Sequence, residues 1–194
     1  MVLTESVQKL KKGDKAPDFS LKGVDDKIYS LKDFEGLPAP LRGQAQAGKQ
    51  GLLVIFMCNH CPYVRAKLPV IAELYKKWGT RISFCGINSN DSGYEGEGMD
   101  NMKVFAKERA IAFPYLFDTL QDVAKAYGAT CTPDPFLFNK NSELVFHGRI
   151  DDATGPGETA KEKTMDENIS KMLSGQEISD EFKPSMGCSI KWTP

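Results

Sequence analysis

The chain has 194 residues, enough for one domain with a buried core. Apolar residues make up 41% and charged residues 26%, which is typical of a soluble globular protein and not of a disordered one. The 25 basic residues are balanced by 26 acidic ones, so no excess of positive charge favours nucleic acid as a partner.

No segment is typical of membrane insertion or secretion. The longest apolar run, residues 52–58, is far too short to span a bilayer, and the first fourteen residues have no apolar signal core. Five cysteines are an odd number and too few for a disulfide scaffold. We therefore expect a cytoplasmic protein whose cysteines are either buried fillers or chemically active.

The first part of the chain predicts a hairpin, a loop and a buried strand. Residues 18–31 alternate apolar and polar side chains around Gly23, as in a β-hairpin. Residues 36–51 are rich in Gly, Pro and Gln and predict an inserted loop. Residues 52–56 are continuously apolar, as in a strand buried on both faces.

A β-α-β unit follows. After Pro62, apolar residues recur at helical spacing: Val64, Leu68, Ile71, Leu74 and Tyr75. Residues 82–87 then form a second apolar run. Strand, helix and strand in this order indicate a right-handed parallel crossover.

The remaining elements complete a mixed sheet. Residues 88–98 are polar and Gly-rich and predict a loop. Helices are expected near 102–106, at 120–127 and at 161–173, with an extended segment at 113–117 and an antiparallel hairpin at 136–139 and 143–147. We expect an α/β fold with helices on both faces of the sheet, in one domain over residues 1–174, and a C-terminal tail over residues 175–194 without a clear period.

The strongest chemical signal is Cys58-Asn59-His60-Cys61, between a buried strand and an amphipathic helix. A C-x-x-C motif in this setting indicates a redox pair. A helix N-terminus offers unpaired N–H groups and positive charge, which can lower a cysteine pKa from about 8.5 to roughly 3.5–7.5. Pro62 suits the first helical position, so we expect Cys61 to be the helix cap. A cationic His60 would stabilise the thiolate further.

Two other interpretations of these cysteines remain open. The pair could be a matter of packing alone. A structural zinc site needs four ligands, and Cys131, Cys188, His60 and His147 could complete one, although the sequence has no second paired knuckle. His147 ends an apolar strand and is expected to be structural. We expect no metal and no other cofactor.

Several segments resemble the thioredoxin-fold superfamily in its peroxiredoxin-like, redoxin-domain (AhpC/TSA) branch. They are GDKAPDFSL, YSLKDFEG, LLVIFMCNHCPYVRAKLPVIAELY and YGATCTPDPFLFNKNSELVFHG, which together cover roughly residues 13–173. A group with CNHCPYV, a CTPD segment and a C-terminal GCSIKW is most similar. The resemblance implies a thioredoxin fold and redox chemistry carried by the protein's own cysteines.

The resemblance also sets the register of the active site. Thioredoxins begin the helix with the nucleophilic cysteine and have a proline eight residues later, which matches Cys61 and Pro69. Val64 stands where thioredoxins have their second cysteine. The resemblance therefore implies that Cys61 is the nucleophile, and that Cys58 lies in the loop above it and resolves the intermediate.

The same register weakens a specialised peroxidase function. Peroxiredoxins carry P-x-x-x-T-x-x-C, and this chain has Val54 and Cys58 at the proline and threonine positions. The hydroxyl that helps to hold peroxide is replaced by a thiol. This departure favours a Cys58–Cys61 disulfide, while a peroxidase cycle through a sulfenic acid at Cys61 stays open.

Thr132-Pro133 matches the superfamily's cis-proline site. In the family this bond lies against the active-site cysteine and exposes a backbone edge for substrate, so we expect a cis bond here. Cys131 would then lie close to Cys61, either as a third redox thiol or as a small buried side chain.

Three further residues complete the list of candidates. Cys188 lies in the tail and either resolves a sulfenic acid or packs against the body with Ile190 and Trp192 as docking anchors, and packing is favoured. Cys85 lies in an apolar strand and is expected to be inert. Arg149 could face the site and support a thiolate.

The sequence thus predicts a thiol–disulfide oxidoreductase with Cys61 and Cys58 as its redox pair. The first alternative is a thiol-dependent peroxidase with an antioxidant role, and the second is a metal-binding or structural module without turnover. Expected partners are a disulfide-bearing protein or a peroxide, and a thiol reductant such as a thioredoxin system. Peroxiredoxin-like relatives often dimerise, so a homodimer is left open.

Overall fold

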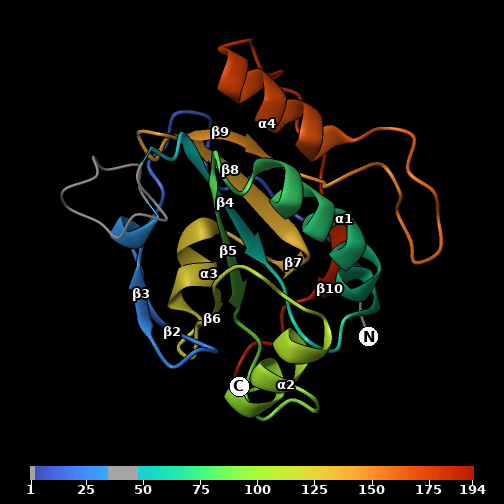
Figure 1. The fold of residues 1–194 in the computed structure, drawn as a ribbon. Helices are drawn as coiled ribbons and strands as arrows, with labels where there is room; N and C mark the ends of the chain where they lie inside the picture. Colours follow the sequence, from blue (N-terminus) through green and yellow to red (C-terminus); the bar gives the residue numbers. More distant parts are fainter. Residues whose placement is uncertain (1–2, 35–47) are drawn as a thin grey trace.

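A seven-stranded mixed sheet forms the centre of the molecule (Figure 1). The structure, a computed structural model, describes residues 3–34 and 48–194. The strand order is β3-β2-β6-β5-β4-β8-β9. In that order the strands span Ile28–Ser30, Ser20–Gly23, Tyr115–Phe117, Ser83–Asn88, Gly51–Phe56, Asp134–Asn139 and Leu144–His147.

The middle of this sheet combines both pairing senses. Strand β4 pairs in parallel with β5 and antiparallel with β8, and β5 pairs in parallel with β6. The hairpins β2–β3 and β8–β9 are antiparallel. The predicted β-α-β crossover and both predicted hairpins are therefore confirmed.

Helices cover both faces of the sheet. They are α1 (Pro62–Trp78), α2 (Met99–Glu108), α3 (Asp122–Tyr127) and α4 (Thr164–Ser174), with a short 3-10 helix at Leu31–Asp33. Side chains of β4 alternate between the two faces. Leu53 and Ile55 pack in one core with residues of α1, α2 and α4, whereas Val54 and Phe56 pack in a second core with residues of α3.

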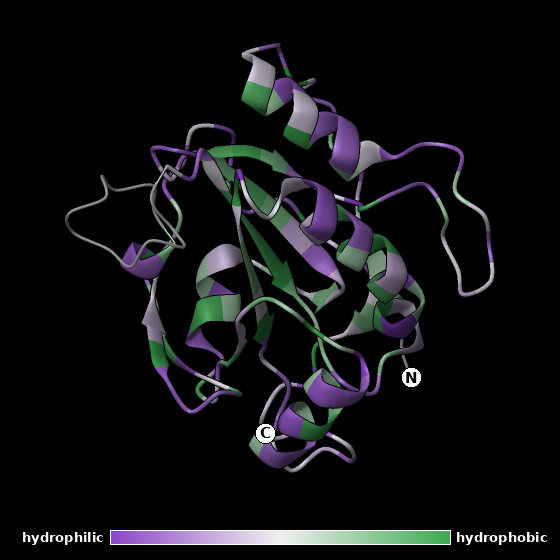
Figure 2. Ribbon diagram, in the orientation of Figure 1, coloured by the Kyte–Doolittle hydropathy of each residue, from purple (hydrophilic) through white to green (hydrophobic). Residues whose placement is uncertain are grey.

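The hydropathy pattern agrees with this layering. All six residues of β4 and of β5 are buried, and Figure 2 shows the central strands as hydrophobic and the helices as mixed. A strand covered by helices on both faces has no polar side to present to water, which explains the continuous apolar runs. Among the described residues, no helix has both the length and the apolar character needed to cross a membrane.

A smaller, three-stranded sheet contains part of the tail. Its order is β1-β10-β7, with β1 at Leu3–Glu5, β10 at Met186–Ser189 and β7 at Cys131–Thr132. Both pairings are antiparallel. The sequence did not predict β10, because a four-residue strand has too few side chains to show alternation and depends on distant partners.

Other differences are small shifts of boundaries. The last helix begins at Thr164, three residues later than expected, and the extended segment after α2 is limited to Tyr115–Phe117. The predicted loop at 36–51 lies mostly outside the described residues, and its last member, Gly51, begins β4.

Candidate active site

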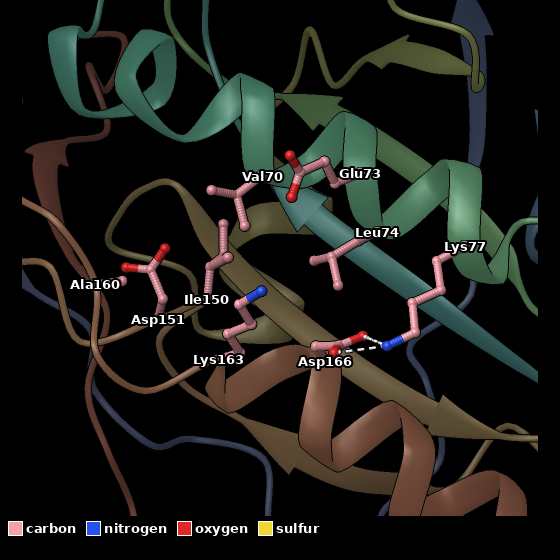
Figure 3. Close-up of a pocket in the computed structure, with 9 residues that line it drawn as sticks. All are labelled: Val70, Glu73, Leu74, Lys77, Ile150, Asp151, Ala160, Lys163 and Asp166. Carbon is pink, nitrogen blue, oxygen red and sulfur yellow. Dashed lines mark hydrogen bonds and ion pairs between the residues drawn. The ribbon is translucent and has the colours of Figure 1, made fainter.

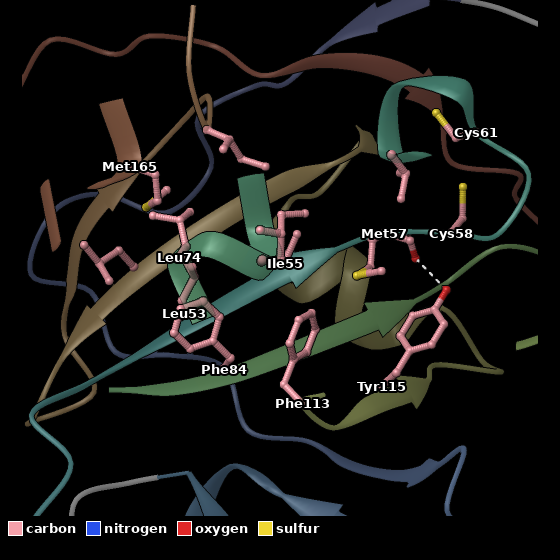
Figure 4. Packing of buried hydrophobic residues seen from close by; sticks show 14 of the residues in the cluster. Leu53, Ile55, Met57, Cys58, Cys61, Leu74, Phe84, Phe113, Tyr115 and Met165 are labelled. Atoms are coloured by element: carbon pink, nitrogen blue, oxygen red, sulfur yellow. Dashed lines mark hydrogen bonds between the residues drawn. The ribbon is translucent and has the colours of Figure 1, made fainter. Parts of the chain in front are cut away.

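The CNHC motif lies where β4 ends and α1 begins, and Figure 4 shows Cys58 and Cys61 at this junction. Cys61 is the N-cap of α1, with an extended backbone (φ −67°, ψ 121°), and Pro62 is the first helical residue. The Cys61 carbonyl accepts a hydrogen bond from the backbone amide of Arg65 at 3.1 Å, which is the first hydrogen bond of the helix. The predicted position of Cys61 at the helix N-terminus is confirmed.

Three thiols meet at Cys61. The Cys61 Sγ lies 2.6 Å from the Cys188 Sγ and 3.4 Å from the carbonyl oxygen of Thr132. Hydrogen bonding by the Cys58 thiol lowers the pKa of Cys61 to about 5; burial opposes this shift, and the Cys188 thiol and the amides of Val64 and Cys188 add to it. Cys61 is thus an ionised thiolate at neutral pH, although its side chain is buried.

The two neighbouring thiols have the opposite tendency. Burial raises the pKa of Cys58 well above its ordinary value, helped by its hydrogen bond to Cys61 and the negative charge of Glu97. Burial and the hydrogen bond to Cys61 likewise raise the pKa of Cys188 to about 12. The site therefore has one thiolate and two protonated thiols, which is the division needed between a nucleophile and its proton-bearing partners.

Glu97 organises the loop between the cysteines. Its buried carboxylate accepts the backbone amides of Asn59 and His60, both at 3.2 Å, and a short hydrogen bond from the His60 Nδ1. Asn88 Nδ2 donates to its second oxygen at 2.6 Å. Glu97 is not among the residues predicted from the sequence. The available signal was a single carboxylate between glycines in the loop that follows β5.

His60 and Glu97 also belong to a group of candidate metal donors. Donor atoms of Cys58, His60 and Glu97 lie within 4.8 Å of one another. Cys58 belongs to the motif pair and His60 is one of the residues that could complete a zinc site with it, whereas Glu97 was not among them. His60 and Glu97 are hydrogen-bonded to each other beside the Cys58 thiol.

The Thr132-Pro133 peptide bond is cis, as predicted. Thr132 touches both cysteines of the motif: its carbonyl contacts Cys61, and its hydroxyl lies 3.2 Å from the Cys58 Sγ. The polypeptide around the cis-proline therefore forms one wall of the thiol cluster.

The tail packs against the body, which was the favoured expectation for Cys188. The Cys188 and Ile190 side chains are buried, whereas Trp192 is 42% exposed. Ile190 is thus the docking anchor, and its amide donates to the carbonyl of Thr130 at 3.0 Å. Packing of the tail and contact between Cys188 and Cys61 occur together, because the packed tail places the Cys188 sulfur beside the Cys61 sulfur.

The other cysteines and the second histidine are buried. Cys131 is buried and burial raises its pKa, with Asp134 as the next cause; Cys85 is buried in the sheet, which also raises its pKa. The ring of His147 stacks on Phe136 and its Nε2 lies 2.9 Å from Asp134. The expected structural role of His147 and the inert position of Cys85 agree with this packing.

Arg149 differs from the expectation. Its guanidinium pairs with Glu162 at 2.6 Å, and its amide donates to the carbonyl of Lys183. The turn after β9 directs the side chain toward the segment before α4. The thiolate is stabilised by thiols and amides, and Arg149 does not contribute to its lowered pKa.

A cavity of about 160 Å³ lies away from the thiols, between α1, α4 and the loop after β9 (Figure 3). Its floor is apolar, with Leu74 and Ile150, and charged side chains such as Lys163 surround it. No cysteine lines this cavity, so it does not provide access to Cys61.

Comparisons with known proteins agree with the geometry. The Redoxin family model matches residues 11–168. A thiol-disulfide oxidoreductase ResA of Bacillus thuringiensis subsp. konkukian is 23% identical over 139 residues, which cover 71% of this chain and 69% of that protein.

Solved structures show the same fold. An uncharacterized conserved protein from Geobacillus kaustophilus is 34% identical with a TM-score of 0.88, and the match covers 100% of this chain and 98% of that one. The thioredoxin domain of a thiol-disulfide oxidoreductase from Bacteroides vulgatus has a TM-score of 0.57 at 19% identity, covering 72% and 89% of the two chains. The mixed sheet and its helices are thus a thioredoxin fold, and the chain belongs to the Redoxin family.

Proposed function

We propose that the protein is a thiol–disulfide oxidoreductase in which Cys61 is the nucleophile. The observation that carries this proposal is the thiolate at the N-terminus of α1, held between two protonated thiols. The similarity to thiol-disulfide oxidoreductases supports the same class of reaction. A disulfide-bearing protein is the class of substrate that these relatives suggest.

The reaction follows from the arrangement of the thiols. The Cys61 thiolate attacks one sulfur of a substrate disulfide, forms a mixed disulfide and releases the other sulfur as a thiolate. A neighbouring thiol then loses its proton and attacks the Cys61 sulfur. This step releases the second substrate thiol and leaves one disulfide in the protein. Two electrons pass to the substrate, and an external dithiol restores the protein.

The surrounding residues serve this reaction without entering it. Glu97 accepts hydrogen bonds from the backbone amides of Asn59 and His60 and therefore fixes the conformation of the motif loop. The hydroxyl of Thr132 orients the Cys58 sulfur, and the Thr132 carbonyl lies 3.4 Å from the Cys61 sulfur. These groups orient the thiols, whereas Cys61 alone makes the first bond to substrate.

The test is a single turnover of the reduced full chain with equimolar 2-hydroxyethyl disulfide. We expect the release of two equivalents of 2-mercaptoethanol, and no release above background from Cys61→Ser. Cys85→Ala, which removes a buried thiol far from the motif, is the matched control and should react like the wild type. Equal release from the wild type and Cys61→Ser would exclude the proposed nucleophile. Consumption of hydrogen peroxide at a comparable rate would instead favour a peroxidase.

A further inference from the structure

Strand β10 brings a thiol from the far end of the chain to the nucleophile. Its antiparallel register with β7 pairs Cys188 with Thr132 and Ser189 with Cys131. Since Thr132 also contacts Cys61, this register places the Cys188 Sγ 2.6 Å from the Cys61 Sγ.

The position that β10 occupies is the natural docking edge of the site. Strand β7 is only two residues long and lies beside the nucleophile. An extended polypeptide binds to such an edge by adding a strand, with its side chains presented to the neighbouring site. Here the chain fills that edge with its own residues, and β1 covers the other side of β10.

The fit of β10 requires a glycine next to Cys188. A Cβ built on Gly187 would lie 1.9 Å from the carbonyl oxygen of Thr132, so any larger residue would push the two backbones apart. Hydrogen bonds fix the strand on both sides of this contact. Ser185 and Ser6 exchange two of them, at 2.8 and 2.9 Å, and Ile190 donates to Thr130.

We propose that β10 is an internal stand-in for a substrate strand and that Cys188 is the thiol that forms the disulfide with Cys61. The proposal rests on the proposed function of Cys61 as nucleophile. After a mixed disulfide forms on Cys61, Cys188 loses its proton, attacks the Cys61 sulfur and releases the second substrate thiol. The oxidised protein then contains a Cys61–Cys188 disulfide and the substrate has gained two electrons and two protons.

The contacts favour Cys188 over Cys58 for this step. The Cys58 Sγ is engaged with the Thr132 hydroxyl at 3.2 Å, whereas the Cys188 Sγ contacts the Cys61 Sγ directly at 2.6 Å. The ammonium of Lys191 binds the carbonyl and the hydroxyl of Ser189, next to Cys188, and its positive charge favours a thiolate at Cys188. Cys58 instead acts as a positioning residue that donates a hydrogen bond to the nucleophile.

The first test identifies the disulfide after one equivalent of 2-hydroxyethyl disulfide, by peptide mapping without reductant. We expect a Cys61–Cys188 disulfide in the wild type and in Cys58→Ser. In Cys188→Ser we expect a 2-mercaptoethanol adduct on Cys61 that lasts at least about tenfold longer, because its contacting thiol is missing. A Cys58–Cys61 disulfide in the wild type, with rapid loss of the adduct in Cys188→Ser, would overturn the proposal. If Cys61 forms neither an adduct nor a disulfide in any variant, the proposed function itself is contradicted.

The second test asks whether β10 blocks the edge. Gly187→Ala should loosen β10, and Gly155→Ala is the matched control, because its new Cβ meets only the end of the Glu158 side chain. We compare the rates of reduction of insulin and of 2-hydroxyethyl disulfide. The insulin rate relative to the small disulfide should rise about tenfold in Gly187→Ala, as expected when backbone hydrogen bonds that compete with substrate are lost. An unchanged ratio in a folded Gly187→Ala protein would show that β10 does not occupy the substrate edge.

Discussion

Glu97 holds His60 from two directions, because one carboxylate oxygen accepts both the backbone amide and the ring Nδ1 of that residue. His60 also packs against the ring of Tyr94, with centroids 4.8 Å apart. The loop between Cys58 and Cys61 is therefore fixed by a residue of the segment that follows β5. A buried charge in this place has consequences for stability and for the neighbouring thiols.

Replacement of Glu97 by Gln should make the protein less sensitive to acid. The hydrogen bonds from His60 and Asn88 lower the pKa of Glu97 below its ordinary value of 4.5, against the effect of burial. A lowered pKa contributes stability that is present above about pH 4.5 and is lost as the pH falls through the folded-state pKa. Urea unfolding at about pH 7 and about pH 4 should show a smaller loss of stability for Glu97→Gln than for the wild type. Equal losses would contradict this assignment.

The thiolate at Cys61 should be visible by its absorbance near 240 nm. We expect a transition with a midpoint near pH 5, which is absent in Cys61→Ser. Cys58→Ala removes the largest stabilising hydrogen bond, so its midpoint should move to higher pH, further than in Cys188→Ala. A midpoint that is the same in Cys58→Ala and the wild type would exclude Cys58 as a donor to the thiolate.

The Cys61 thiol should also make the free energy of unfolding increase as the pH rises from about 5 to 9. Since the folded-state pKa of Cys61 lies below its ordinary value of 9.0, its contribution is fully present above pH 9 and is lost as the pH falls toward 5. The free energy of unfolding of the wild type should therefore gain more between these limits than that of Cys61→Ser. A larger gain in the variant would contradict the sign.

Tyr115→Phe should destabilise the motif loop without changing its chemistry. The buried hydroxyl of Tyr115 donates to the Asn59 side chain at 2.9 Å. Its removal leaves a buried acceptor unpaired, which costs about 1–3 kcal/mol. Urea unfolding measures this loss, and the midpoint of the Cys61 transition is the control for an intact site. A stability equal to the wild type would show that water replaces the hydroxyl.

Cys131→Ala should leave disulfide exchange unchanged within about twofold. Burial and the charge of Asp134 raise the pKa of Cys131, so it remains a protonated thiol. Its Sγ makes a long contact to the carbonyl of Ser185, at 3.9 Å. Single-turnover release of 2-mercaptoethanol compares the variant with the wild type. A loss as large as that of Cys61→Ser would make Cys131 part of the reaction.

The parts of the fold that depend on local pattern could be predicted from the sequence. Continuous apolar residues identified β4, helical spacing identified α1, and Pro62 identified Cys61 as the residue at the start of that helix. Resemblance to a known family supplied the cis bond before Pro133. Each of these features is encoded within a few neighbouring residues.

The features that sequence analysis missed depend on distant partners. Strand β10 exists because β1 and β7 lie on either side of it, and its four residues contain no pattern of their own. Glu97 is in a polar, Gly-rich loop that resembles exposed loops, and only the folded chain shows it buried below His60. The predicted placement of Arg149 near the thiolate was wrong for the same reason, because its guanidinium pairs with the distant Glu162.

The most direct test of the central claim is competitive labelling of the reduced, folded protein with a limiting amount of iodoacetamide at neutral pH. Peptide mapping then reports which of the five cysteines reacts first. The account predicts Cys61, because it is the only one of these buried thiols whose pKa is lowered. Preferential labelling of Cys58 or Cys188 would contradict the assignment of Cys61 as the nucleophile.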